Sequence, residues 1–91
     1  MLVAEMSMIK ITWVLREVMA RYKIKNKELA EAFGRNDASI SRIKTTDEMP
    51  EFNGGELESL CNALTRVLKN KGINKVISPG DLLSWESIDE E

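Results

Sequence analysis

Apolar residues recur along most of the chain at the three- and four-residue spacing of amphipathic helices. One stripe of this kind predicts a helix over residues 12–22, and a longer one predicts a helix over residues 55–70. The first stripe consists of Ile11, Leu15, Val18, Met19 and Tyr22, and the second consists of Leu57, Leu60, Cys61, Leu64, Val67 and Leu68. Two stretches that contain Gly or Pro, residues 45–55 and 72–80, divide the chain between these segments.

Two shorter helices are predicted in the middle of the chain, each preceded by an asparagine that can cap it. Asn26 precedes a helix over residues 27–33, and Asn36 precedes one over residues 37–44. Gly34 follows the first of these helices, where a C-terminus often requires positive φ. The inward-facing residues are Leu29, Ala30 and Phe33 on the first helix and Ile40 and Ile43 on the second.

The two ends of the chain carry different signals. A capping Ser78, a proline at the first helical position and the acid Asp81 predict a fifth helix over residues 79–85. Apolar and polar residues alternate from Met8 to Trp13, which favours an extended lead-in that could be a short strand. We expect residues 1–8 to be a flexible extension, 9–85 to be the folded domain and 86–91 to be a frayed acidic tail.

The composition is typical of one soluble globular domain. Of the 91 residues, 43% are hydrophobic and 31% are charged, which is enough for one compact core. We expect this core to contain Leu15, Val18, Leu29, Ala30, Phe33, Ile40, Ile43, Leu57, Leu60, Cys61, Leu64 and Leu68.

The composition also excludes several function classes. There is no histidine and one cysteine, which excludes a histidine general base, a His/Cys zinc site and an intramolecular disulfide. The sequence contains no nucleophile–base pair and no phosphate-binding Gly loop, so we expect no enzyme, no metal and no cofactor. A lone thiol suits the cytoplasm, and no apolar run approaches the roughly 18 residues of a membrane span. Glu5 precedes any basic residue, unlike in a secretion signal.

Charge is unevenly distributed along the chain. Residues 1–47 hold nine Lys/Arg and six Asp/Glu, a net +3, whereas residues 48–91 hold four and nine, a net −5; together they give the total of −2. A chain with a small net charge can therefore carry one basic face that suits nucleic acid. The alternative is chance clustering of charges on solvated helices.

The most informative segment is residues 26–43, where two short helices are joined by a tight turn at 34–36. Ala30 offers a small side chain where the two helix axes cross, and Ile40 and Ile43 hold the second helix against the first. The outer face of the second helix is small and polar and includes one cation; it comprises Ala38, Ser41, Arg42 and Thr45. A major groove about 12 Å wide admits one helix of this kind.

The spacing of Leu29-Ala30, Gly34, Ile40 and Ile43 resembles the helix-turn-helix of Cro and phage-repressor-type regulators, the XRE family. The resemblance extends from the first predicted helix to Leu83, and it implies an all-α, compact five-helix lambda-repressor-like domain. Arg35 departs from the small aliphatic residue usual in the family and could add a phosphate contact. Asn36 replaces the frequent Ser or Thr and keeps the capping chemistry.

The resemblance also implies roles for individual residues. Its base-reading positions fall on Asp37, Ala38, Ser41 and Arg42, and its DNA-backbone positions fall on or near Asn26, Lys27, Arg35, Asn36, Lys44 and Thr45. Arg42 could donate two hydrogen bonds to a guanine edge. Asp37 could accept from a cytosine amino group, or it could only favour the positive end of its helix.

Three functions are compatible with these observations. The first is a sequence-specific transcriptional regulator, repressor-like, that binds double-stranded DNA as a homodimer on a palindromic operator. The second is an antitoxin or protein-interaction module whose acidic C-terminal half binds a toxin, and the third is a helix-turn-helix domain kept only for assembly. The expected dimer interface consists of Leu82, Leu83 and Trp85; the alternative is antiparallel pairing of the segment Met8–Trp13 with its copy.

Overall fold

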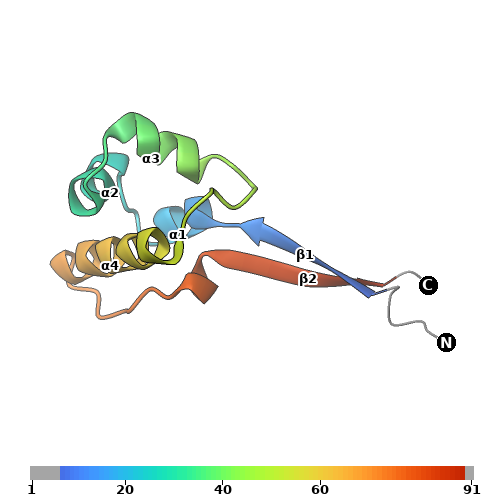
Figure 1. Cartoon of the computed structure of the whole chain (residues 1–91). Helices are drawn as coiled ribbons and strands as arrows, with labels where there is room; N and C mark the ends of the chain where they lie inside the picture. The colour runs from blue at the N-terminus through green and yellow to red at the C-terminus, as the bar shows by residue number, and fades with distance from the viewer. Residues whose placement is uncertain (1–6, 90–91) are drawn as a thin grey trace.

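The computed structural model describes residues 7–89, which form four α-helices, one 3₁₀ turn and a two-stranded antiparallel sheet. In chain order these are β1 (Ser7–Trp13), α1 (Leu15–Arg21), α2 (Asn26–Phe33), α3 (Asp37–Lys44), α4 (Gly54–Asn70), η2 (Pro79–Asp81) and β2 (Leu83–Asp89). The helices pack into one body, and β1 and β2 form a ribbon that extends away from it (Figure 1).

The core lies between the four helices and the base of the ribbon. Most of the expected core residues are buried, whereas Phe33, Ile43 and Leu57 are half-buried and pack against the edge of the core. The buried residues that the expectation omitted are Trp13, Met19, Ile24, Ala63, Val67, Ile77 and Leu82. Trp13 and Leu82 therefore join the two ends of the chain to the helical body.

The helices in the middle of the chain begin and end within one residue of the prediction. Asn36 caps α3 as expected, because its Oδ1 accepts a hydrogen bond from the Ser39 backbone N–H at 2.8 Å. Asn26 is not a cap, contrary to the prediction; α2 begins at Asn26, and the preceding Lys25 donates its backbone N–H to Glu28 at 2.8 Å. α1 begins later than predicted because the chain remains extended through Trp13.

The predicted fifth helix is wrong. The start signature is real, since the Ser78 backbone N–H donates to Asp81 Oδ2 at 2.9 Å, but it closes only the single turn of η2. The chain then continues as β2, with Leu83 opposite Trp13 in the ribbon and Leu82 fully buried. Pairing with β1 supplies partners for the backbone of residues 83–89, and this tertiary contact prevails over the local helix signal.

The sheet also corrects the all-α expectation and includes part of each segment assigned to a flexible end. Met8, assigned to the flexible extension, lies in β1 opposite Ile88, and residues 86–89, assigned to the frayed tail, continue β2. Residues 1–6 and 90–91 lie outside the described residues, and so does that part of the two assignments.

Candidate nucleic-acid interface

The turn between α2 and α3 is built by backbone contacts. Gly34 has a φ of 78°, in the left-handed region that favours glycine. Its N–H and that of Arg35 both donate to the carbonyl of Ala30, at 2.9 and 3.0 Å, and end α2. The chain then enters α3 at once through the Asn36 cap. These contacts set the angle between the two helices of the helix-turn-helix.

The inner face and the C-terminal end of α3 are held by the rest of the domain. Ile40 is fully buried. Trp13 Nε1 donates to the Ile43 carbonyl at 2.9 Å, which satisfies one of the last four carbonyls of the helix. Lys44 Nζ donates to Asn26 Oδ1 at 2.8 Å and ties the end of α3 to the start of α2. α3 is therefore presented as a rigid element.

The outer face of α3 is open to solvent. All four expected base-reading residues are exposed: Asp37, Ala38, Ser41 and Arg42. Among residues 7–89, no side-chain hydrogen bond or ion pair involves the Asp37 carboxylate or the Arg42 guanidinium. The face therefore offers an unpaired donor and an unpaired acceptor to a base edge, on a helix with small side chains beside them.

The expected DNA-backbone residues differ in their freedom. Lys27 is exposed, whereas Asn26 and Lys44 bind each other as described above. Thr45 Oγ1 donates to the Ser41 carbonyl at 2.9 Å, and Asn36 uses its side-chain oxygen as the cap. Lys44 keeps two further N–H donors and its charge, and Asn36 keeps its amide group, so these residues can still bind phosphate.

Arg35 has surroundings that the sequence did not indicate. Its guanidinium pairs with Glu56 at 3.0 Å and lies 4.8 Å from the centroid of the Phe33 ring and 5.9 Å from that of Phe52. Glu56 and Phe52 come from the start of α4 and the loop before it, and the separation along the chain left no signal for this contact. The two aromatic rings and the carboxylate hold Arg35 at the N-terminal end of α3.

A hollow of about 410 Å³ lies next to α3, and it includes both Arg35 and Arg42 in its lining. Its other side is the loop between α3 and α4, from Thr46 to Phe52. The acids Glu48 and Glu51 of this loop also line it. Phosphate approaching this side of α3 therefore meets two cations and two acids, so the basic character of the face is local to α3.

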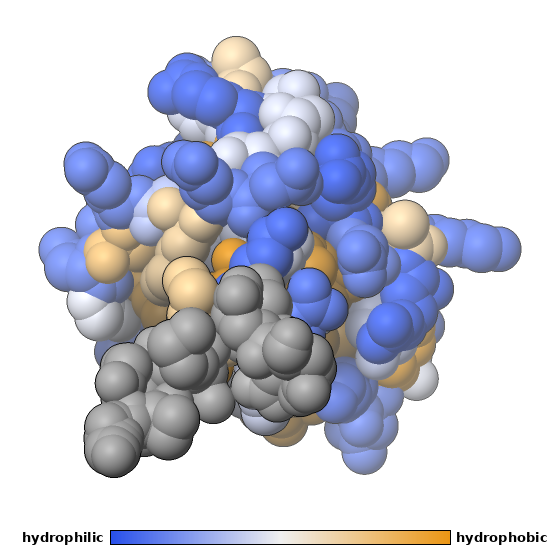
Figure 2. Space-filling view, turned by 90° about the vertical axis from the view of Figure 1, so that its right-hand side faces the viewer, coloured by the Kyte–Doolittle hydropathy of each residue, from blue (hydrophilic) through white to orange (hydrophobic). Residues whose placement is uncertain are grey.

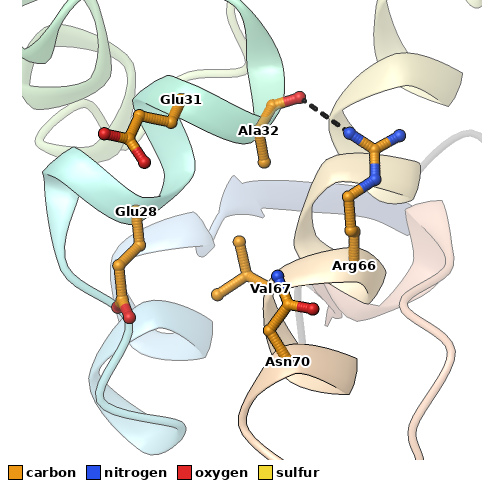
Figure 3. A pocket seen from close by; sticks show the side chains of 6 residues that line it. All are labelled: Glu28, Glu31, Ala32, Arg66, Val67 and Asn70. Carbon is orange, nitrogen blue, oxygen red and sulfur yellow. Dashed lines mark hydrogen bonds between the residues drawn. The ribbon is translucent and has the colours of Figure 1, made fainter.

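A second hollow, of about 380 Å³, separates α2 from α4 (Figure 3). Arg66 reaches across it and donates to the Ala32 carbonyl at 3.5 Å. Glu28 pairs with Lys71 at 3.2 Å, and the hydrogen bond from the Lys25 N–H is the main cause that holds the pKa of Glu28 below its ordinary value. These contacts fasten α2 to α4, and we assign them to support of the helix-turn-helix.

The remaining expected site residues lie on or beside the ribbon. Leu82 is fully buried in the monomer, which corrects its assignment to a dimer interface, because no surface remains for a partner. Leu83 is half-buried and Trp85 is 67% exposed.

Within residues 7–89, no three potential metal ligands cluster, and no helix is long and apolar enough to span a bilayer.

Comparison with known proteins assigns the helical body to a family. Neither the curated proteins nor the solved structures gave a match. The family model described as the Cro/C1-type HTH DNA-binding domain matches residues 14–75, which span α1, the helix-turn-helix and α4. Both strands of the ribbon lie outside the matched residues. The match covers more than half of the chain, which therefore belongs to the Cro/C1-type family of helix-turn-helix DNA-binding domains.

Proposed function

We propose that this protein is a sequence-specific, repressor-like transcriptional regulator that inserts α3 into the major groove of double-stranded DNA. The contrast between the two faces of α3 carries the proposal: Ile40 is fully buried, whereas Arg42 on the other face is exposed. A helix anchored along one side and small and polar along the other suits a groove that accepts one helix. Such a regulator acts where its DNA lies, in the cytoplasm of a prokaryotic cell.

Within this proposal, the residues of α3 and its surroundings divide into two roles. Arg42 reads a guanine edge, and Asp37, Ala38 and Ser41 contact the neighbouring bases. Lys27, Lys44, Asn26, Asn36 and Thr45 bind phosphates and set the register, as does Arg35 after exchanging Glu56 for phosphate. An exposed ion pair such as Arg35–Glu56 contributes about 0–1 kcal/mol, so this exchange costs little.

The proposed DNA-bound form is a homodimer on a palindromic operator. One helix with about four base-reading side chains covers too few base pairs to select a site in a genome. Two copies related by a two-fold axis read two half-sites, and their binding free energies combine.

Selection of bound duplexes from a random pool, followed by titration of the recovered site, tests this function. Arg42→Ala is expected to lose about 1–3 kcal/mol on the selected site and little on random DNA. Lys44→Ala is expected to weaken both DNAs equally and to lower the salt slope by about one. Equal losses for Arg42→Ala on both DNAs would contradict base reading, and recovery of no preferred sequence would contradict the proposed function itself.

A second candidate function is an antitoxin that binds a partner protein through its acidic C-terminal half. Two observations favour it: residues 48–91 carry a net charge of −5, and Trp85 in this half is 67% exposed. Co-purification of one small basic protein in stoichiometric amount, lost on charge reversal of the C-terminal half, is the result expected for an antitoxin. Purification of the chain alone with full DNA binding is the result expected for a simple regulator.

A further inference from the structure

The chain between α1 and α2 carries a cluster of cations. Residues 21–27, from the end of α1 to the first turn of α2, hold four Lys/Arg and no Asp/Glu, a net +4 in a chain whose total is −2. The four residues are Arg21, Lys23, Lys25 and Lys27, and all are exposed. Among residues 7–89, no ion pair and no side-chain hydrogen bond involves any of these four side chains. The cluster therefore presents positive charge that no acid neutralises.

Exposure alone does not distinguish this cluster from the rest of the surface. In the view from the end of the ribbon, hydrophilic side chains make up much of the surface (Figure 2). Four cations elsewhere in the described part of the chain form ion pairs, and one of these is Lys71, which binds Glu28 at 3.2 Å. Glu28 is the acid that follows the cluster in the sequence, and this pair already engages it. The sign of the charge and the lack of a partner therefore set residues 21–27 apart.

Lys23 has a backbone conformation that disfavours a side chain. Its φ is 56°, and among residues 7–89 it is the one non-glycine residue with a positive φ. The turn that ends α1 imposes this conformation, because the Lys23 and Ile24 N–H groups donate to the carbonyls of Ala20 and Met19 at 3.2 and 2.8 Å. Glycine is the usual residue at such a position, since a Cβ is crowded there. A strained lysine in place of glycine points to a function of its side chain.

Lys25 also lies where its charge opposes the local structure. It is the N-cap residue of α2, and its side chain makes no capping hydrogen bond. Asn, Asp, Ser and Thr are favoured at this position, and the N-terminal end of a helix disfavours cations. Arg21, by contrast, lies in the last turn of α1, where a cation is favourable. Local stability therefore accounts for Arg21 but not for Lys23 or Lys25.

The two lysines lie near the C-terminal end of α3. Lys44 Nζ donates to Asn26 Oδ1 at 2.8 Å, so the end of α3 is next to the start of α2. Consecutive Cα atoms are about 3.8 Å apart, which places the backbone of Lys25 beside Asn26 and that of Lys23 within about 11 Å of it. A helix about 10–12 Å across fills a major groove about 12 Å wide, so the phosphates that border the groove pass close to the helix.

We infer that Lys23 and Lys25 form a second phosphate-binding patch, which holds the backbone of the duplex whose major groove α3 occupies. The inference rests on the proposed function and extends it, because both residues precede the helix-turn-helix. Their ammonium groups bind phosphodiester oxygens and release counterions, and they read no bases. The strained turn and the cation at the start of α2 weaken the fold slightly, and the contacts with phosphate offset this on DNA.

Two substitutions of Lys23 separate binding from stability. Lys23→Gly removes the charge and relieves the strained φ, whereas Lys23→Gln removes the charge and keeps the strain. Both variants are expected to bind selected and random duplexes at most about eightfold more weakly in about 0.1 M salt, and to lower the salt slope by about 0.9. Only Lys23→Gly is expected to raise the midpoint of urea unfolding. Unchanged or tighter DNA binding by the more stable Lys23→Gly would overturn the inference.

The same comparison applies to Lys25. Lys25→Asn supplies a favoured capping residue and is expected to raise the urea midpoint, whereas Lys25→Gln is expected to leave it nearly unchanged. Both are expected to lower the salt slope by about 0.9, and an unchanged slope in both would remove Lys25 from the patch.

Lys75→Gln is the matched control for these variants. Lys75 is an exposed lysine in the segment that leads to η2, and η2 lies across α4 from α2 (Figure 1). We expect this substitution to leave the salt slope unchanged and to alter DNA affinity less than about twofold, because charges beyond a Debye length are screened. Circular dichroism checks that every variant is folded.

Lys23→Gln combined with Lys25→Gln separates a failure of this inference from a failure of the proposed function. A wild-type protein that selects one sequence, and whose double variant keeps the wild-type salt slope, would overturn the patch and leave the regulator intact; the lysines would then serve a different partner. A slope that falls by about 1.8 on duplexes among which the wild type shows no preference would retain the patch and overturn the regulator.

Discussion

Replacement of Trp13 by phenylalanine perturbs the residue that connects the ribbon, α3 and the core. Trp13 is 2% exposed, its Nε1 donates to the Ile43 carbonyl at 2.9 Å, and its ring contacts Phe52 edge-on with centroids 6.1 Å apart. Its backbone N–H also binds the Asp47 carbonyl at 2.9 Å, a contact that Trp13→Phe keeps. The substitution therefore removes the indole donor and part of the ring and leaves the backbone contact intact.

Two losses determine the size of the effect. The Ile43 carbonyl is part-buried at the end of α3, and leaving it without its donor costs about 1–2 kcal/mol. The smaller ring leaves a cavity in the core, which costs a further 1–2 kcal/mol or so. The total, roughly 2–4 kcal/mol, is a large fraction of the roughly 5–14 kcal/mol expected for a domain of this length. Because α3 loses a tether at its C-terminal end, we also expect weaker DNA binding.

Urea unfolding followed by circular dichroism measures the loss. Trp85→Phe is the control, since it is the same substitution in the same ribbon at a side chain that is 67% exposed. We expect the free energy of unfolding of Trp13→Phe to fall clearly, and that of Trp85→Phe to change by about 0.5 kcal/mol or less. Equal midpoints for the two variants would refute the role assigned to the indole hydrogen bond.

Three further substitutions and one labelling experiment test other contacts. Ala30→Leu inserts a larger side chain at a buried position of α2 and is expected to cost about 1–3 kcal/mol in urea unfolding; an unchanged midpoint would show that the site has room. Gly34→Ala is expected to cost about 1 kcal/mol by backbone strain alone, because a Cβ there meets nothing within 4 Å, whereas Gly54→Ala in α4 serves as a neutral control. The Ser78 N–H holds the pKa of Asp81 below its ordinary value of 3.8, so this carboxylate stabilises the fold above that pH and the contribution is lost as pH falls through the lowered pKa. Asp81→Asn should therefore lower stability at pH 7 and have little effect under strongly acidic conditions; a difference that persists there would contradict the assignment. Burial raises the pKa of the Cys61 thiol, so labelling by a thiol reagent should be slow at pH 7 and become fast on unfolding, and rapid labelling of the folded chain would contradict its burial.

The sequence was sufficient for the parts of the fold that depend on local contacts. α2, α3 and α4 were predicted within one residue at each end, because their caps and apolar stripes lie within the elements themselves. The left-handed Gly34 and the exposure of Arg42 followed from the same patterns. The roles of the individual residues on DNA stay predictions.

The parts that failed depend on contacts between distant residues. The capping signature of Ser78 and Asp81 is the same before a single turn and before a whole helix. Pairing with β1, about 70 residues earlier in the chain, determines that a strand follows the turn. Asn26 was expected to cap α2, but it is the first residue of the helix and Lys44 binds its side chain; the pairing of Arg35 with Glu56 was likewise not predicted. Such partners become visible only when the chain is folded.

The pairing of β1 with β2 has a consequence for the kinetics of folding. Ser7 lies opposite Asp89 in the ribbon, so this contact closes nearly the whole chain, whereas α2, the turn and α3 are contiguous. Loop closure of that length is slow compared with helix formation, and contacts of high sequence separation tend to form late. We expect α2, the turn and α3 to form early in folding, and the ribbon to close last. The chain would thus acquire its DNA-facing surface first and its ribbon last.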